Sequence, residues 1–162
     1  LLGPKAGGFL GFVFGLTSLI NNTTQPGLTA FCFSPFISMG EGLGGSPLAL
    51  IVCFLPRILT GVVAYYVYRG LQKLDKKEGP GKLSLLFAGV AGSMTNTILV
   101  MGMIYLFFGS AYAAARGIAY EAVLGVILSV VGINGTIEAV VAALLAGAIC
   151  LAVMKANVLK TK

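Results

Sequence analysis

Apolar residues form four long runs that polar segments separate. The runs cover residues 6–20, 48–71, 84–108 and 134–154. The last three are long enough for membrane-spanning helices, whereas the first is just short of a full crossing. The pattern therefore predicts an all-α membrane protein, built as a small transmembrane helical bundle. At 162 residues, the chain is expected to form one domain over residues 1–162.

Glycines recur at regular intervals in the first run. Gly7, Gly11 and Gly15 are four residues apart, so a helix would line them along one face. Within a membrane, a face without side chains lets a neighbouring helix approach closely. A flexible loop is the other interpretation, but the Phe, Leu and Val residues between the glycines favour a packed helix.

Residues 21–47 form a long polar segment that contains three phenylalanines. A loop of this length without periodicity is usually functional or disordered. Phe31, Phe33 and Phe36 favour a packed lid. Phe31 and Phe33 alternate as in an extended segment, and we expect them either to form the apolar wall of a site or to pack the interior of the loop.

Composition restricts the class of function. Hydrophobic residues make up 57% of the chain and charged residues 10%, which indicates an integral membrane protein. The net charge of +6 is spread between the apolar runs and the tail, an arrangement that orients a membrane protein rather than one that binds nucleic acid. The sequence contains no histidine, no paired cysteines, no P-loop and no catalytic constellation. We expect no enzyme activity, no metal and no cofactor.

The basic residues also predict an orientation. Cytoplasmic segments are enriched in Lys and Arg, which places residues 69–82 and 155–162 inside and the 21–47 segment outside. An even number of crossings must separate two inside segments, and the runs at 84–108 and 134–154 supply two. Residues 110–133, which contain Arg116 and Glu121, are therefore expected to lie along or dip into the outer face rather than to span the membrane.

Arg57 lies about nine residues into the second run, roughly 14 Å below its outer end. A charge at that depth usually faces the bundle interior or a wet cavity. One interpretation is a group that binds an anion or acts in gating. The other is an arginine that bonds backbone carbonyls freed by Pro56, or that pairs with Glu138.

Three further polar residues lie in or beside the apolar runs. Asn96 has an amide that suits either a ligand or a hydrogen bond between helices. Asn134 and Glu138 are four residues apart and so share one helix face, at the predicted outer entrance of the last run. The pair is expected to form the polar rim of a cavity, although the helix dipole alone would also favour Glu138 there.

Five short motifs, in their order and spacing, resemble the substrate-binding S-components of energy-coupling-factor (ECF) vitamin transporters, most of all the pantothenate type. The motifs are Leu2-Gly3-Pro4-Lys5-Ala6-Gly7, Phe33-Ser34-Pro35-Phe36, Pro56-Arg57-Ile58-Leu59-Thr60-Gly61, Thr95-Asn96-Thr97 and Asn134-Gly135-Thr136-Ile137-Glu138. The resemblance implies a six-helix fold in which the segments here correspond to the third to sixth helices. The first two helices are then expected to be missing from this sequence.

The resemblance also implies a function. Such a subunit sits in the bacterial plasma membrane, captures a water-soluble vitamin at the outer face, and delivers it inward with a transmembrane coupling subunit and two ATPase subunits. Pantothenate has a carboxylate, hydroxyls and an amide. Arg57 would complement the carboxylate, while Asn96, Asn134 and the loop residues Thr24 and Gln25 would bond the other groups.

Other functions remain open from the sequence. Riboflavin, folate, or pyridoxine and the related hydroxymethylpyrimidine would use similar polar groups. A self-sufficient secondary carrier would need titratable groups inside the membrane, where the chain offers only Glu138 and Glu121. A structural subunit without a ligand fits the composition but leaves the outer polar residues unexplained.

Overall fold

The computed structural model describes residues 3–38, 45–74 and 81–155. Its elements are α1 (Pro4–Thr24), the short 3-10 helix η1 (Ala30–Cys32), α2 (Leu48–Leu74), α3 (Lys82–Arg116) and α4 (Tyr120–Lys155). All regular elements in these ranges are helices, so the predicted all-α fold is confirmed. By length and composition, α2, α3 and α4 are each able to cross a membrane.

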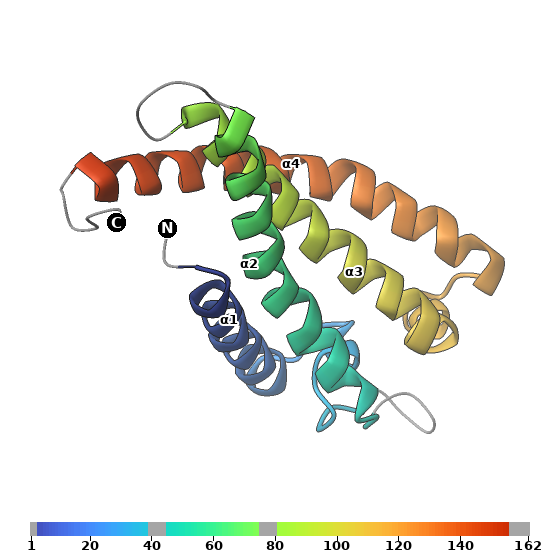
Figure 1. Ribbon diagram of the computed structural model, residues 1–162. Helices are drawn as coiled ribbons and strands as arrows, with labels where there is room; N and C mark the ends of the chain where they lie inside the picture. The colour runs from blue at the N-terminus through green and yellow to red at the C-terminus, as the bar shows by residue number, and fades with distance from the viewer. Residues whose placement is uncertain (1–2, 39–44, 75–80, 156–162) are drawn as a thin grey trace.

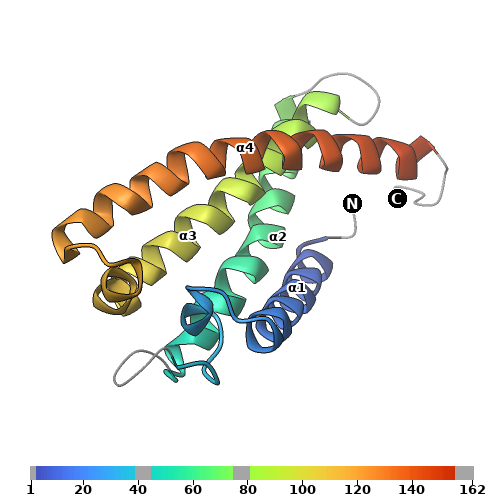
Figure 2. The same cartoon turned by 180° about the vertical axis from the view of Figure 1, so that it is seen from behind.

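Each helix packs mainly against the helix that follows it, in antiparallel order (Figure 1). The start of α1, the end of α2, the start of α3 and the end of α4 lie at one end of the molecule. The view from behind in Figure 2 shows η1 and the turn between α3 and α4 at the opposite end. Lys5 and Arg69 therefore lie at one end, as the charge-based orientation predicts.

Close backbone contact between α1 and α2 depends on glycine. A Cβ atom at Gly11 would overlap the carbonyl oxygen of Arg57, and one at Gly7 would lie 2.8 Å from the carbonyl oxygen of Gly61. A Cβ atom at Gly15 would lie 2.7 Å from the ring of Phe54. The glycine face of α1 thus lies directly against α2, which is the arrangement that its four-residue spacing predicts.

The main core lies toward the end that carries η1, between α2, α3, α4 and η1. Phe31 is fully buried there and packs edge-on against Phe108, with ring centroids 6.1 Å apart. Because η1 is a 3-10 turn, Phe31 and Phe33 do not alternate as in an extended segment, and that prediction is wrong. Phe31 belongs to the core rather than to the wall of a site. Phe36 is 75% exposed and does not contribute to loop packing.

Residues 110–133 are not a separate segment, and that part of the expectation is wrong. That they do not span the membrane by themselves stays a prediction. Residues 110–116 complete α3, and residues 120–133 are the first half of α4, which continues without a break. Between the two helices, Gly117 adopts a left-handed conformation with φ 64° and closes the last turn of α3 through its N–H. The helices reverse direction over only three residues.

The two charged residues of this region mark helix ends. Arg116 lies in the last turn of α3 and Glu121 in the first turn of α4, where each complements the helix dipole. With 36 residues, α4 is roughly 54 Å long, which exceeds the hydrocarbon core of about 30 Å. It must therefore tilt or extend beyond the core. The even number of crossings between the two basic segments is unchanged.

Candidate functional site

The contacts between helices place several polar residues at one depth in the bundle. Gly11 of α1 meets the backbone of Arg57 on α2. Gly92 of α3 faces α2 at Thr60, with 3.4 Å between a Cβ atom at Gly92 and the Thr60 carbonyl oxygen. Because α2 and α3 are antiparallel, Asn96, one turn after Gly92, lies at the level of Arg57.

Glu138 of α4 lies at the same depth in the bundle. The hydroxyl of Thr97 donates to a carboxylate oxygen of Glu138 at 2.9 Å. One turn away, Gly135 allows α4 to approach Thr97, with 3.3 Å between a Cβ atom at Gly135 and the Thr97 methyl group. We call Arg57, Asn96, Thr97 and Glu138 the polar belt, since they come from three helices at one depth.

Arg57 is anchored by a backbone carbonyl that proline leaves free. Its Nη1 donates to the carbonyl oxygen of Val52 at 2.8 Å. Val52 would normally accept the backbone N–H four residues later, but that residue is Pro56, which has none. The interpretation of Arg57 as a partner for carbonyls freed by Pro56 therefore accounts for one of its N–H groups.

The remaining donors of Arg57 are not all accounted for. The side chain is only 7% exposed, and its Nε atom finds no hydrogen-bond partner among the residues that the structure describes. Glu138 bonds to Thr97 instead, so the suggested pairing of Arg57 with Glu138 does not occur. A buried guanidinium without a carboxylate partner is costly, because its desolvation is not compensated.

Two aromatic rings pack on this guanidinium. Its central carbon lies 5.8 Å from the ring centroid of Phe14 on α1 and 5.1 Å from that of Phe33, which follows η1. These distances are within the range of cation–π attraction. The hydroxyls of Thr23 and Ser34 are 2.7 Å apart and tie the same loop to the end of α1. The loop that carries Phe33 thus closes over Arg57.

Asn96 also has an unsatisfied buried atom. Its Oδ1 has no hydrogen-bond partner within the described ranges. A hydrogen bond between helices, the alternative interpretation of Asn96, therefore does not explain this oxygen. A buried acceptor that lacks a donor costs about 1–3 kcal/mol. A ligand with an N–H or O–H group would remove that cost.

Asn134 and Glu138 lie in the middle of α4 rather than at its start. They are the fifteenth and nineteenth of its 36 residues, so they do not begin the last helix, and the helix dipole does not explain Glu138. Both residues are exposed, and Asn134 borders an open groove along α4 together with Ser129 and Ile133. Of the two, only Glu138 forms a hydrogen bond to a polar-belt residue in the described part of the chain.

Thr24 and Gln25 lie exposed at the end of α1. The Thr24 hydroxyl donates to the carbonyl oxygen of Ile20 at 2.9 Å, and the backbone of Gln25 caps the helix. The structure does not bring these two side chains into the polar belt. Phe14, which packs on Arg57, and Thr97, which bonds Glu138, are not among the candidates from the sequence, although Thr97 belongs to the Thr95-Asn96-Thr97 motif.

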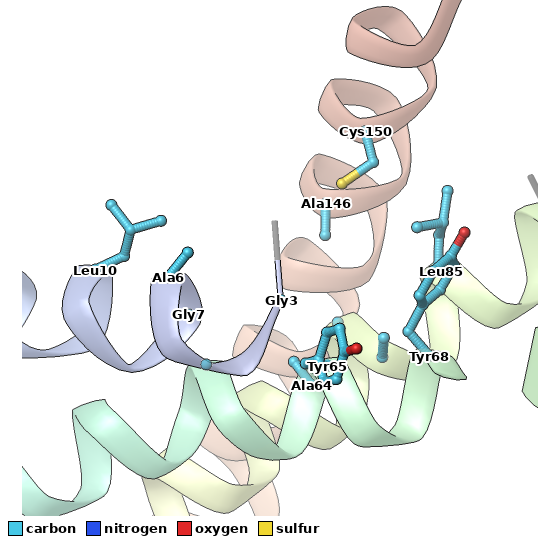
Figure 3. A pocket seen from close by; sticks show the side chains of 13 residues that line it. Gly3, Ala6, Gly7, Leu10, Ala64, Tyr65, Tyr68, Leu85, Ala146 and Cys150 are labelled. Carbon is cyan, nitrogen blue, oxygen red and sulfur yellow. The ribbon is translucent and has the colours of Figure 1, made fainter. Parts of the chain in front are cut away.

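A cavity of about 280 Å³ opens between all four helices, near the start of α1 (Figure 3). Tyr65 and Tyr68 of α2 point toward it, and small or apolar side chains form most of its lining. It includes no residue of the polar belt. This cavity therefore does not suit a charged, hydroxylated ligand.

Comparison with known proteins agrees with the resemblance seen in the motifs. The family described as ECF transporter, substrate-specific component, matches residues 1–150. The pantothenic acid transporter PanT of Lactococcus lactis subsp. cremoris is 38% identical over 157 residues, which are 97% of this chain and 72% of that protein. The pantothenate transporter PanT of Leuconostoc mesenteroides is 27% identical over 149 residues, 92% of this chain and 66% of that protein. No solved structure matches the chain.

Proposed function

Because the chain belongs to the substrate-specific components of ECF transporters, we propose that it is the subunit that captures pantothenate at the outer face of the membrane. The family is one of transporters, and the three long apolar helices make the chain a multi-pass protein of a bacterial cell membrane. Two similar proteins carry the name of pantothenate transporters, which supports this vitamin.

The observation that carries the proposal is that Arg57 is buried without a full set of hydrogen-bond partners in the described ranges. Its guanidinium is buried, and its Nε is unpaired within the described part of the chain. A carboxylate bound to two N–H groups of an arginine forms the strongest type of hydrogen-bonded ion pair. The carboxylate of pantothenate would therefore compensate the charge that the protein leaves unpaired.

The other groups of pantothenate match the rest of the polar belt. The Oδ1 of Asn96 accepts a hydrogen bond from the amide N–H of the vitamin, which satisfies its missing partner. The carboxylate of Glu138 accepts from a hydroxyl group, with Asn134 one turn away on α4. Thr24 and Gln25 contribute only if the end of α1 moves toward the belt.

We place the energy source in partner subunits. The 162 residues contain no phosphate-binding loop, and we propose that other chains hydrolyse ATP. A transmembrane coupling subunit and two ATPase subunits are the partners that membership of the family supports.

Equilibrium binding of radiolabelled pantothenate to the full chain in detergent tests the proposal. We expect saturable binding that unlabelled pantothenate displaces and that riboflavin, folate and pyridoxine do not. Saturable binding of labelled riboflavin, folate or pyridoxine without binding of labelled pantothenate would refute the substrate, and binding of none of the four would refute vitamin capture. Uptake into vesicles that lack any ATPase would instead support a self-sufficient carrier.

A further inference from the structure

We propose that Pro56 is a positioning residue that makes the site selective for a carboxylate, by directing which edge of the Arg57 guanidinium faces the ligand. The inference rests on the proposed function, since it concerns the same site. It assigns a role to a residue that itself contacts no ligand.

The first step is the effect of proline on α2. Pro56 lies inside the helix and lacks the N–H that would bond to the carbonyl oxygen of Val52. The pyrrolidine ring also crowds the carbonyl four residues earlier, which displaces it from the helix axis. Val52 is fully buried, so water cannot readily satisfy its carbonyl.

The second step is the capture of this carbonyl by Arg57. Its Nη1 donates to the Val52 carbonyl oxygen at 2.8 Å, which satisfies both groups in a buried position. Because a guanidinium is planar and rigid, fixing Nη1 also fixes the direction of the other N–H groups.

The third step concerns the edge of the Arg57 guanidinium that a carboxylate can use. A carboxylate can pair with the guanidinium through Nη1 and Nη2 or through Nε and Nη2. The Val52 carbonyl takes one of the two N–H groups of Nη1, whereas Nε is buried and lacks a partner among the described residues. The Nε–Nη2 edge, which does not use Nη1, is therefore the edge that we assign to a carboxylate.

Two aromatic contacts support this orientation. Phe14 and Phe33 lie within 6 Å of the guanidinium carbon and restrict its movement. A neutral ligand group such as an alcohol accepts fewer and weaker bonds from this edge than a carboxylate does. Selectivity for a carboxylate over an alcohol thus depends on the carbonyl that Pro56 leaves free.

The test compares two ligands on three forms of the full chain. Pantothenate and pantothenol differ only in that an alcohol replaces the carboxylate. We would measure both dissociation constants for the wild type, for Pro56→Ala and for Thr60→Val. Alanine restores an N–H that competes for the Val52 carbonyl. Thr60→Val is the matched control, because it removes only the hydrogen bond from the Thr60 hydroxyl to the Pro56 carbonyl.

We expect the wild type to prefer pantothenate by roughly thirtyfold or more, as for other buried charge pairs. Pro56→Ala should reduce this preference at least about fivefold, with little change in the affinity for pantothenol. Thr60→Val should retain the preference. In a double-mutant cycle, Pro56→Ala should have no further effect on the preference once Arg57 is glutamine, because proline acts through the arginine.

If Pro56→Ala leaves the preference unchanged, whether or not both affinities fall, the role of Pro56 is overturned while the proposed function stays intact. Failure of the wild type to bind either compound would overturn both. Pro56→Gly supplies the same N–H without a side chain and replaces the alanine variant if thermal unfolding shows that variant to be misfolded.

Discussion

The proposed ligand site depends on individual buried atoms. Asn96 has an Oδ1 without a partner in the part of the chain that the structure describes. We predict that Asn96→Ala weakens pantothenate binding about tenfold or more, the effect of losing one buried hydrogen bond. Radioligand binding would measure the loss, with unchanged expression of the variant as the check on folding.

Thr95 provides the control for this prediction. Its hydroxyl donates to the carbonyl oxygen of Ala91 on the same helix, at 2.7 Å. Thr95→Val should therefore leave the affinity unchanged. If Asn96→Ala also leaves it unchanged, Asn96 is not part of the site.

Burial controls the chemistry of Cys32 in η1. The surrounding apolar residues raise the pKa of its thiol to about 12, so the reactive thiolate is scarce at pH 7–9. In a variant with Cys53 and Cys150 changed to alanine, iodoacetamide should label the folded protein very slowly and the unfolded protein readily. The folded state should also lose stability as the pH rises above the ordinary thiol pKa of about 8.5, because only the unfolded thiol ionises there.

The labelling rate decides this prediction. Mass spectrometry would follow alkylation at pH 8 before and after unfolding in detergent. Labelling of the folded protein at the rate of a free cysteine would contradict the burial of Cys32.

The residue scale is where the sequence was least informative. It indicated Arg57 and Asn96 as functional candidates, because polar groups within an apolar run are costly. It could not show that both retain an unpaired atom, since this depends on the antiparallel register of α2 and α3. Phe31 and Phe33 looked equivalent in the sequence, but the 3-10 turn sends one into the core and the other toward Arg57.

Contact between α1 and α2 is the most sensitive feature at the scale of elements. A Cβ atom at Gly11 would overlap the Arg57 carbonyl, so the helices must separate in Gly11→Ala. We predict that the free energy of unfolding falls by about 1–3 kcal/mol, as for other overpacked interfaces. Pantothenate binding should also weaken, because Arg57 moves. Thermal unfolding in detergent and radioligand binding would measure the two effects.

Gly8 is the matched control on the same helix. A Cβ atom there would lie 3.7 Å from the nearest side-chain atoms, an ordinary contact. Gly8→Ala should therefore leave stability and binding almost unchanged. Equal effects of the two substitutions would contradict the close packing at Gly11.

Helix type could be predicted from the apolar runs, but helix extent could not. Residues 84–108 and 134–154 were recognised as spans, whereas α3 and α4 are each about ten or more residues longer. In the sequence, Arg116 and Glu121 favour a surface segment, whereas in the structure they stabilise the helix ends at a tight turn. Hydropathy alone does not separate these two uses of charge.

At the scale of the whole molecule, the fold places η1 at the end opposite the start of α1 and the end of α2, which carry Lys5 and Arg69. We predict that Leu28→Cys, in a variant without native cysteines, reacts with a membrane-impermeant maleimide from outside the cell. Gln72→Cys should react only after the membrane is permeabilised, because positive segments remain inside. The reverse pattern would put the polar belt on the wrong side for vitamin capture.

The most direct test of the account is the affinity of Arg57→Gln for pantothenate, measured together with the stability of the unliganded protein. We predict that binding weakens at least about thirtyfold, as expected when one partner of a buried charge pair is removed. The melting temperature of the free protein would be measured beside the affinity to check that the variant folds, because Arg57 also bonds the buried Val52 carbonyl. Unchanged affinity in a folded variant would contradict the claim that Arg57 receives the carboxylate.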